Sequence, residues 1–115
     1  MLNSYQKLKI LAVGAHGDDI ELACGGTLAK AIECNHQVEM VLVTGSGSDD
    51  HNDVAIRNKD EAKREATMAA KILGVDNLHI LGYEDTNVPY SAELISKLDK
   101  IILEFNPDII FTHFV

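Results

Sequence analysis

Apolar residues along this chain fall into short continuous runs, separated by longer segments in which they recur at helical spacing. The runs predict four strands, at Leu8–Ala15, Gln37–Thr44, Leu78–Leu81 and Asp108–Val115. The segments between them predict three helices, at Ile20–Glu33, Asn58–Leu73 and Ala92–Phe105. Gly74 follows the second helix as a suitable C-cap, and Ser91 precedes the third as a suitable N-cap. The elements therefore alternate as strand and helix along the whole chain.

This alternation predicts the fold class. Nearly continuous apolar strands joined by helices are typical of a parallel sheet covered on both faces. We expect an α/β fold over residues 1–115, a single domain built as a Rossmann-like three-layer αβα sandwich with a mostly parallel sheet. The sequence stops at Val115, inside an apolar strand that would normally lead to another covering element. We therefore expect a fold truncated after its fourth strand, the amino-terminal portion of a larger domain.

Composition narrows the function classes. With 115 residues, 46% of them hydrophobic, the chain has enough apolar material for one core. A formal net charge of -8 argues against nucleic-acid binding, which needs clustered Lys and Arg. No signal peptide is visible, and no run approaches the roughly 18 apolar residues of a transmembrane segment. Cys24 and Cys34 lack the spacing of a redox or thiolate-zinc motif, and two such cysteines favour a cytoplasmic location.

The candidate chemistry lies in His16-Gly17-Asp18-Asp19, between the first strand and the first helix. Open α/β sheets bind ligands beyond the carboxyl ends of their strands. An imidazole and a carboxylate can hold a divalent metal, while a second carboxylate acts as a general base. The spacing alone leaves another interpretation open, in which Asp18 is an N-cap, Asp19 a first-turn acid and His16 a loop residue.

The segment Ala15–Lys30 (AHGDDIELACGGTLAK) resembles the signature of the LmbE-like, or PIG-L-type, N-acetylglucosaminyl deacetylases. The resemblance continues in order through VEMVLVTGSG, AAKILGV, LGYED and NPDIIFTH. It implies a zinc-dependent enzyme that removes the acetyl group from a small-molecule amino sugar or its conjugate. Carried over to this chain, it implies that His16 and Asp19 are Zn²⁺ ligands and that Asp18 is the base that activates water.

The chain also departs from the family pattern. Gly17 stands where the family usually has proline. Ala62 stands where the family often has an arginine, and we expect Arg57 to bind substrate in place of that arginine. The family's third metal ligand is a histidine in a His-x-x-His segment shortly after the fourth strand, and the sequence ends at Val115, before such a segment. We expect an incomplete site with two of three protein ligands. His113 precedes the third-ligand segment, so we expect it near the site but not on the metal.

Two loops contain weaker candidates. Asp85 follows the third strand, at the same edge of the sheet as the histidine motif, and is a candidate for binding sugar hydroxyls. The segment Gly45–Asp53 is rich in glycine, serine and aspartate and predicts a long solvated loop, which could act as a substrate lid. Its acidic residues do not follow the EF-hand pattern, which disfavours a second metal site.

Other functions remain open at this stage. A nucleotide-binding Rossmann-like module is disfavoured because GxGxxG is missing and two aspartates would repel a pyrophosphate. A metal-dependent phosphatase is disfavoured because the DxD spacing is absent. A non-catalytic, truncated chain that binds metal without turnover is the main alternative to the deacetylase. An exposed fourth strand would favour association into a homo-oligomer.

Overall fold

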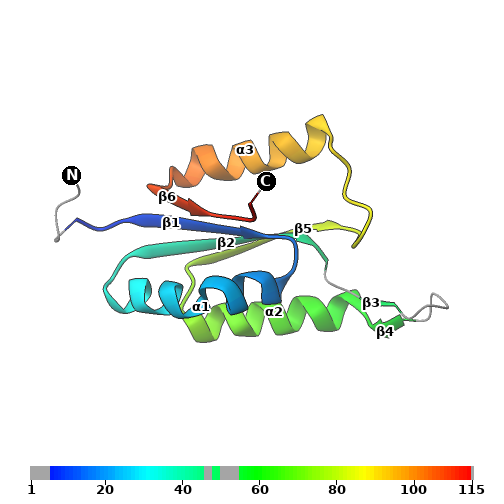
Figure 1. The fold of residues 1–115 in the computed structure, drawn as a ribbon, viewed down its shortest axis with the longest axis horizontal. Coiled ribbons are helices and arrows are strands. Elements are labelled where there is room, and N and C mark those ends of the chain that lie inside the picture. The colour runs from blue at the N-terminus through cyan, green and yellow to red at the C-terminus, as the bar shows by residue number, and fades with distance from the viewer. Residues whose placement is uncertain (1–5, 46–47, 50–54, 115) are drawn as a thin grey trace.

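A four-stranded parallel sheet forms the centre of the fold, with helices on both faces (Figure 1). The computed structural model describes residues 6–45, 48–49 and 55–114, with only the backbone for 48–49 and 55–57. The strands of the sheet are β1 (Lys9–Gly14), β2 (Gln37–Thr44), β5 (Asn77–Tyr83) and β6 (Ile109–Phe111). The helices are α1 (Gly17–Glu33), α2 (Lys59–Leu73) and α3 (Ala92–Phe105). Two short strands, β3 (Ser48–Asp49) and β4 (Ala55–Arg57), form a separate antiparallel pair.

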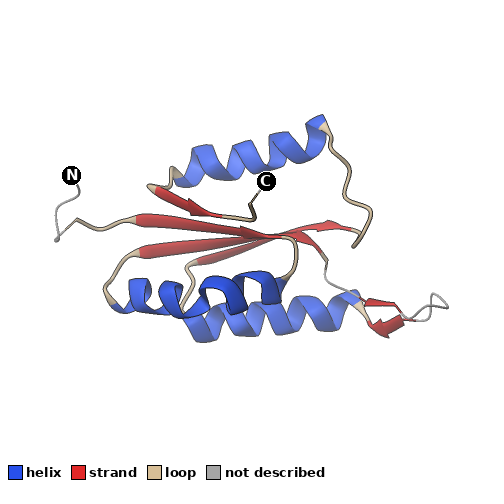
Figure 2. Ribbon diagram, viewed as in Figure 1, coloured by secondary structure: helices blue, strands red, loops and turns tan. Residues whose placement is uncertain are grey.

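The fold has three layers, because α1 and α2 cover one face of the sheet and α3 covers the other (Figure 2). Side chains alternate between the two faces along each strand. From β1, Ile10 and Ala12 pack towards α1, whereas Leu11 packs with Ile101 of α3. In β2, Met40 and Leu42 join the first cluster and Val41 the second. The predicted α/β sandwich with a parallel sheet is confirmed.

The strand order, β5-β2-β1-β6, determines where the edge of the sheet can bind a ligand. The chain runs outwards from β1 through β2 to β5, and then returns to place β6 on the other side of β1. The order therefore reverses at β1 and β6, which is the kind of switch point where open α/β sheets bind ligands. His16 follows β1 and His113 follows β6, so both histidines lie at this point.

The predicted helix boundaries are confirmed to within one residue, except for the start of α1. The second helix begins after Asn58, whose side chain accepts a hydrogen bond from the Glu61 N–H at 2.8 Å, and it ends at Gly74 in the left-handed conformation with φ 87°. Ser91 caps α3 by accepting the Leu94 N–H at 3.2 Å. The first helix begins at Gly17, three residues before the predicted start at Ile20.

Two strand ends differ from the prediction by more than one residue. Strand β5 continues past Leu81 to Tyr83, because its pairing with β2 shifts register near Gly82, which has φ 78°. Glycine adopts this backbone conformation readily, so the residue that predicts a turn here allows a bulge instead. Strand β6 is shorter than the predicted Asp108–Val115 and pairs with β1 over only three residues.

The segment Gly45–Asp53, predicted as a loop, contains β3, which pairs with β4. Its residues 46–47 and 50–53 lie outside the described residues, and so does the proposed lid. None of the helices in the described part of the chain is long and apolar enough to cross a membrane. Both cysteines are free thiols, with Cys24 half-buried and Cys34 exposed. The cytoplasmic location and the homo-oligomer stay predictions.

Candidate metal centre

The first turn of α1 is fixed by the residues of the motif itself. His16 is the N-cap, and its backbone N–H donates a hydrogen bond to Asp19 Oδ2 at 2.8 Å. This contact resembles half of a capping box, in which the third helical residue reaches back to the cap. The interpretation of Asp18 as the N-cap is therefore wrong, because Asp18 is the second residue of the helix. Gly17 is the first, a position that suits the proline of the family pattern.

Gly14 allows α1 to begin close to the end of β1. A Cβ atom at this position would lie 2.9 Å from Ile20 Cγ1, a contact that side chains essentially never make. Because the glycine has no Cβ, the buried side chain of Ile20 packs directly against the strand end. The close packing keeps the motif at the carboxyl edge of the sheet.

His16, Asp18 and Asp19 each offer one potential ligand atom, and these three atoms all lie within 4.8 Å of one another. His16 Nδ1 and Asp19 Oδ2 are 3.4 Å apart. Two ligands of a tetrahedral zinc ion, each bonded at about 2.0–2.1 Å, are separated by about 3.4 Å. An imidazole with carboxylates is also a donor set that zinc accepts. The residues present therefore fit a zinc ion.

Asp18 differs from its two neighbours in being exposed. No hydrogen bond or ion pair of its carboxylate occurs among the described residues, whereas Asp19 contacts both His16 and His113. The Asp18 side chain is thus close to the other two donors and has no partner among the residues that the structure describes. An unengaged carboxylate beside a metal position is able to accept a proton from water.

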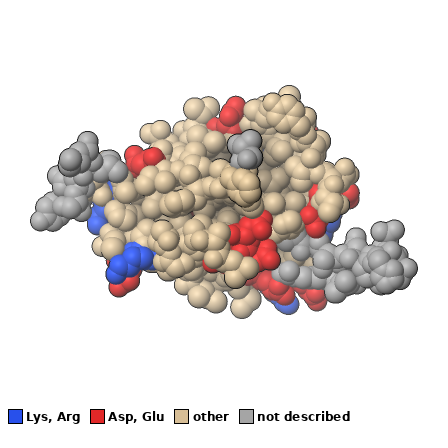
Figure 3. Space-filling model, viewed as in Figure 1, with Lys and Arg blue, Asp and Glu red and all other residues tan. Residues whose placement is uncertain are grey.

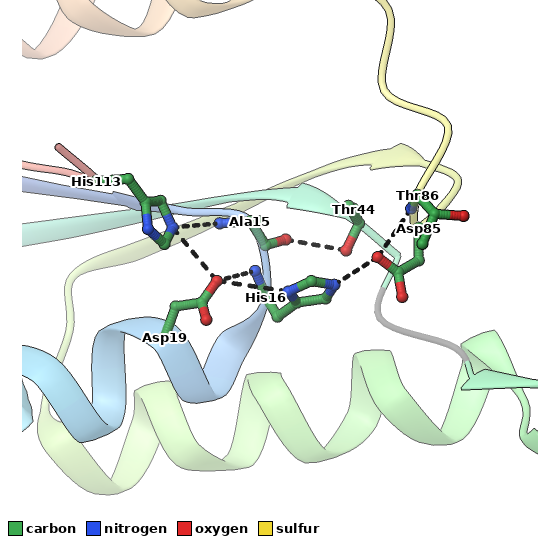
Figure 4. Close-up of polar contacts among 7 residues, drawn as sticks. All are labelled: Ala15, His16, Asp19, Thr44, Asp85, Thr86 and His113. Carbon is green, nitrogen blue, oxygen red and sulfur yellow. Dashed lines mark hydrogen bonds and ion pairs between the residues drawn. The ribbon is translucent and has the colours of Figure 1, made fainter. Parts of the chain in front are cut away.

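The second ring nitrogen of His16 is held by a residue that the sequence places far away. Asp85, in the loop after β5, brings its Oδ1 to 2.7 Å from His16 Nε2 (Figure 4). The same oxygen accepts the Thr86 N–H at 2.9 Å. The prediction placed Asp85 on this edge of the sheet as a sugar-binding residue, but it missed the contact with His16.

His113 lies beside the motif, as expected if β1 and β6 are neighbours. Its Nε2 accepts the Ala15 N–H at 3.2 Å and is 3.3 Å from Asp19 Oδ2 (Figure 4). The His113 side chain thus occupies the backbone donor of the first residue after β1. On the other side, the buried Thr44 donates its hydroxyl to the Ala15 carbonyl at 2.9 Å. Sequence reasoning missed Thr44, although a polar residue at the end of an apolar strand is a pattern that could have indicated it.

The charges around the motif favour a cation. The hydrogen bond to Asp85, together with the charges of Asp85 and Asp19, raises the pKa of His16 although partial burial opposes this. Burial acts to raise the pKa of Asp19, but the backbone hydrogen bond from His16 and the charges of His16 and His113 outweigh it and the pKa falls. Acidic side chains gather over the start of α1 (Figure 3).

A cavity of about 330 Å³ borders the motif and is lined by residues of α1, β1 and the end of β6. Asp19 and His113 are part of its lining. The volume is at the lower end of the range of about 300–1,000 Å³ that is typical of small-molecule sites. A larger cavity of about 710 Å³ lies between α2 and β5, and none of the three clustered residues lines it. We regard the smaller cavity as the relevant one, because it adjoins the metal-binding donors.

The other predicted site residues are only partly located. Arg57 is the last residue of β4, and its side chain lies outside the described part of the structure. Asp49 belongs to β3, where again only the backbone is described, and Asp50, His51 and Asp53 lie outside the described residues. The roles expected for Arg57 and for the acidic loop stay predictions.

Comparison with known proteins gives consistent matches. The profile of the PIG-L family, described as GlcNAc-PI de-N-acetylase, matches residues 11–115. The chain is 32% identical over 108 residues to the diacetylchitobiose deacetylase of Thermococcus kodakarensis, covering 89% of this chain and 39% of that protein. It is 38% identical over 106 residues to a protein of Escherichia coli K12 named "Uncharacterized deacetylase YaiS", covering 89% and 53%.

Among solved structures, the N,N'-diacetylchitobiose deacetylase from Pyrococcus horikoshii aligns with a TM-score of 0.74 and 30% identity. The alignment covers 89% of this chain and 39% of that one. The chain thus spans 39% and 53% of the length of the two curated relatives named above. The profile match begins inside β1, covers nearly the whole chain and includes the histidine motif and β6. The chain belongs to the PIG-L (LmbE-like) deacetylase family.

Proposed function

We propose that the protein is a zinc-dependent hydrolase that removes the N-acetyl group from an N-acetylglucosamine-type amino sugar or conjugate. The observation that carries the proposal is the cluster of one imidazole and two carboxylates, with ligand atoms within 4.8 Å, at the switch point of the sheet. Family membership supports the reaction class, since the two curated relatives reported above are named deacetylases.

In this proposal, His16 and Asp19 hold the metal and Asp18 is the general base. When bound, zinc would polarise the amide carbonyl and make a nearby water more acidic. Asp18 accepts the proton of that water, since its carboxylate is exposed and has no partner within the described structure. The contacts of Asp19 with the His16 N–H and of His16 with Asp85 fix the orientation of both ligands. Catalytic zinc sites usually have three protein ligands, and these residues provide two.

The substrate side of the proposal rests on the relatives and on the cavity beside the motif. Two of the relatives are named for deacetylation of diacetylchitobiose, an acetylated amino sugar. Asp85 Oδ1 is engaged by His16 and Thr86, whereas Oδ2 has no hydrogen-bond partner in the described part of the chain. Oδ2 is therefore available to accept a hydroxyl group of a sugar. Arg57 is the proposed second substrate-binding residue.

Metal removal tests the function. The zinc-loaded protein is expected to release acetate from N,N'-diacetylchitobiose or N-acetylglucosamine, and the chelator-treated protein is expected to release none until zinc is restored. Acetate is measured by a coupled assay, with zinc content determined on the same samples. Stoichiometric zinc without acetate release from either sugar would support the non-catalytic alternative. Binding of a nucleotide by the metal-free protein would favour the Rossmann-like binding module.

A further inference from the structure

The contact between His16 and Asp85 distinguishes the two nitrogens of the imidazole ring. His16 Nε2 lies 2.7 Å from Asp85 Oδ1, and His16 Nδ1 lies 3.4 Å from Asp19 Oδ2 (Figure 4). An ionised carboxylate can only accept hydrogen bonds, so the short contact requires a proton on Nε2. In the neutral ring, that proton leaves a lone pair on Nδ1.

The orientation of Asp85 is itself fixed. The Thr86 N–H donates to the same Oδ1 atom at 2.9 Å, and Thr86 has a left-handed backbone with φ 61°. Asp85 therefore presents Oδ1 towards His16 through the local structure of the loop after β5. The contact joins this loop to the N-cap of α1, across 69 residues of sequence.

The free lone pair of Nδ1 faces another acceptor. Neither Nδ1 of the neutral ring nor Asp19 Oδ2 carries a proton, so the two atoms cannot form a hydrogen bond with each other. Their separation of 3.4 Å is that of two ligands on one tetrahedral ion. A cation would satisfy both atoms. Histidine ligands of metals commonly donate their other N–H to a carboxylate, which fixes the tautomer and the direction of the ring.

We propose that Asp85 is a positioning residue of the metal centre, which holds the proton of His16 on Nε2 so that Nδ1 binds the metal together with Asp19. The inference rests on the proposed function, because it takes His16 to be a metal ligand. It adds a role for Asp85 that differs from contact with the sugar. Oδ1 acts on the histidine, while Oδ2 stays available to substrate.

The tautomer is tested by NMR of the ¹⁵N-histidine-labelled protein, with and without zinc. We expect the His16 ring proton on Nε2 in both states, protected from exchange with water by Asp85, and zinc on Nδ1. In Asp85→Ala, the Nε2 proton is expected to exchange faster. A zinc-loaded spectrum with the proton on Nδ1 and the metal on Nε2 would overturn the proposal.

Zinc affinity gives a second readout, which contact of Asp85 with the sugar alone would not change. Loss of an outer hydrogen-bond partner of a metal ligand typically weakens metal binding by about 10–100-fold. We expect a loss of this size in Asp85→Ala and a smaller one in Asp85→Asn, whose amide oxygen still accepts the Nε2 proton. Glu84→Ala is the matched control, since it removes a neighbouring charge whose described contact is with Lys59 rather than His16.

The outcomes separate this inference from the proposed function. Zinc binding by the wild-type protein that is equally tight in Asp85→Ala would overturn the positioning role and leave the deacetylase proposal intact. A wild-type protein that binds no zinc would contradict both. A weaker affinity in Asp85→Ala and Glu84→Ala alike would attribute the effect to the loss of charge and would also overturn the positioning role.

Discussion

Substitution of Asp18 by asparagine is expected to lower the rate of acetate release by about 100- to 10,000-fold, the usual contribution of a general base. Asparagine has nearly the same shape as aspartate but cannot take up a proton at neutral pH. The proposed ligands His16 and Asp19 are unchanged in this variant, and the side chain of Asp18 makes no hydrogen bond within the described structure. Zinc affinity should therefore stay close to that of the wild type while turnover falls.

The control for this variant is Asp60→Asn. Asp60 is the second residue of α2, just as Asp18 is the second residue of α1, so each substitution removes one negative charge from a first helical turn. Such a charge contributes about 0.3–1 kcal/mol at an exposed helix start. Only Asp18→Asn is expected to lose activity. An active Asp18→Asn protein would show that the base is another group.

Substitution of His16 by alanine is expected to abolish stoichiometric zinc binding. His16 provides the imidazole of the proposed donor set, and its loss leaves only carboxylates, which suit magnesium or manganese better than zinc. The decrease in affinity should exceed the about 10–100-fold expected for an outer partner such as Asp85. Calorimetric titration of the metal-free proteins with zinc measures the difference directly.

His36→Ala is the control for this variant. His36 Nδ1 accepts the Leu8 N–H at 3.0 Å, just before β1 and β2 begin, at the edge of the sheet opposite His16. This variant also loses one imidazole group, but at a position away from the motif. Zinc stoichiometry should therefore stay at one per chain. Retention of tight zinc binding by His16→Ala would mean that the metal lies elsewhere.

The elements of the three-layer sandwich were predictable because each carries its own local signal, whereas the short pair of β3 and β4 was not predicted. The continuous apolar run of β2 predicts Gln37–Thr44, which is the strand observed. Ser91 and Gly74 mark helix ends through capping geometry that depends only on neighbouring residues. The end of β6 was not predictable in the same way, since the run that predicts the strand continues past Phe111 whereas its pairing with β1 stops there.

The site residues likewise fall into those that neighbouring sequence predicts and those that only the folded sheet brings together. His16, Asp18 and Asp19 are adjacent in sequence, so their proximity follows from the chain itself. Asp85 meets His16 only because β5 lies in the same sheet as β1 and its carboxyl end faces the same edge. The start of α1 at Gly17 was missed because the hydrophobic pattern begins at Ile20, whereas the helix begins where Asp19 can cap it.

The position of zinc in the loaded protein is the most direct test of the proposed centre. Anomalous diffraction at the zinc edge, from crystals of the zinc-loaded protein, locates the ion without reference to activity. We expect a single strong peak about 2.0–2.1 Å from both His16 Nδ1 and Asp19 Oδ2. A peak at other residues, or none at this corner of the sheet, would contradict the assignment of His16 and Asp19 as the ligands.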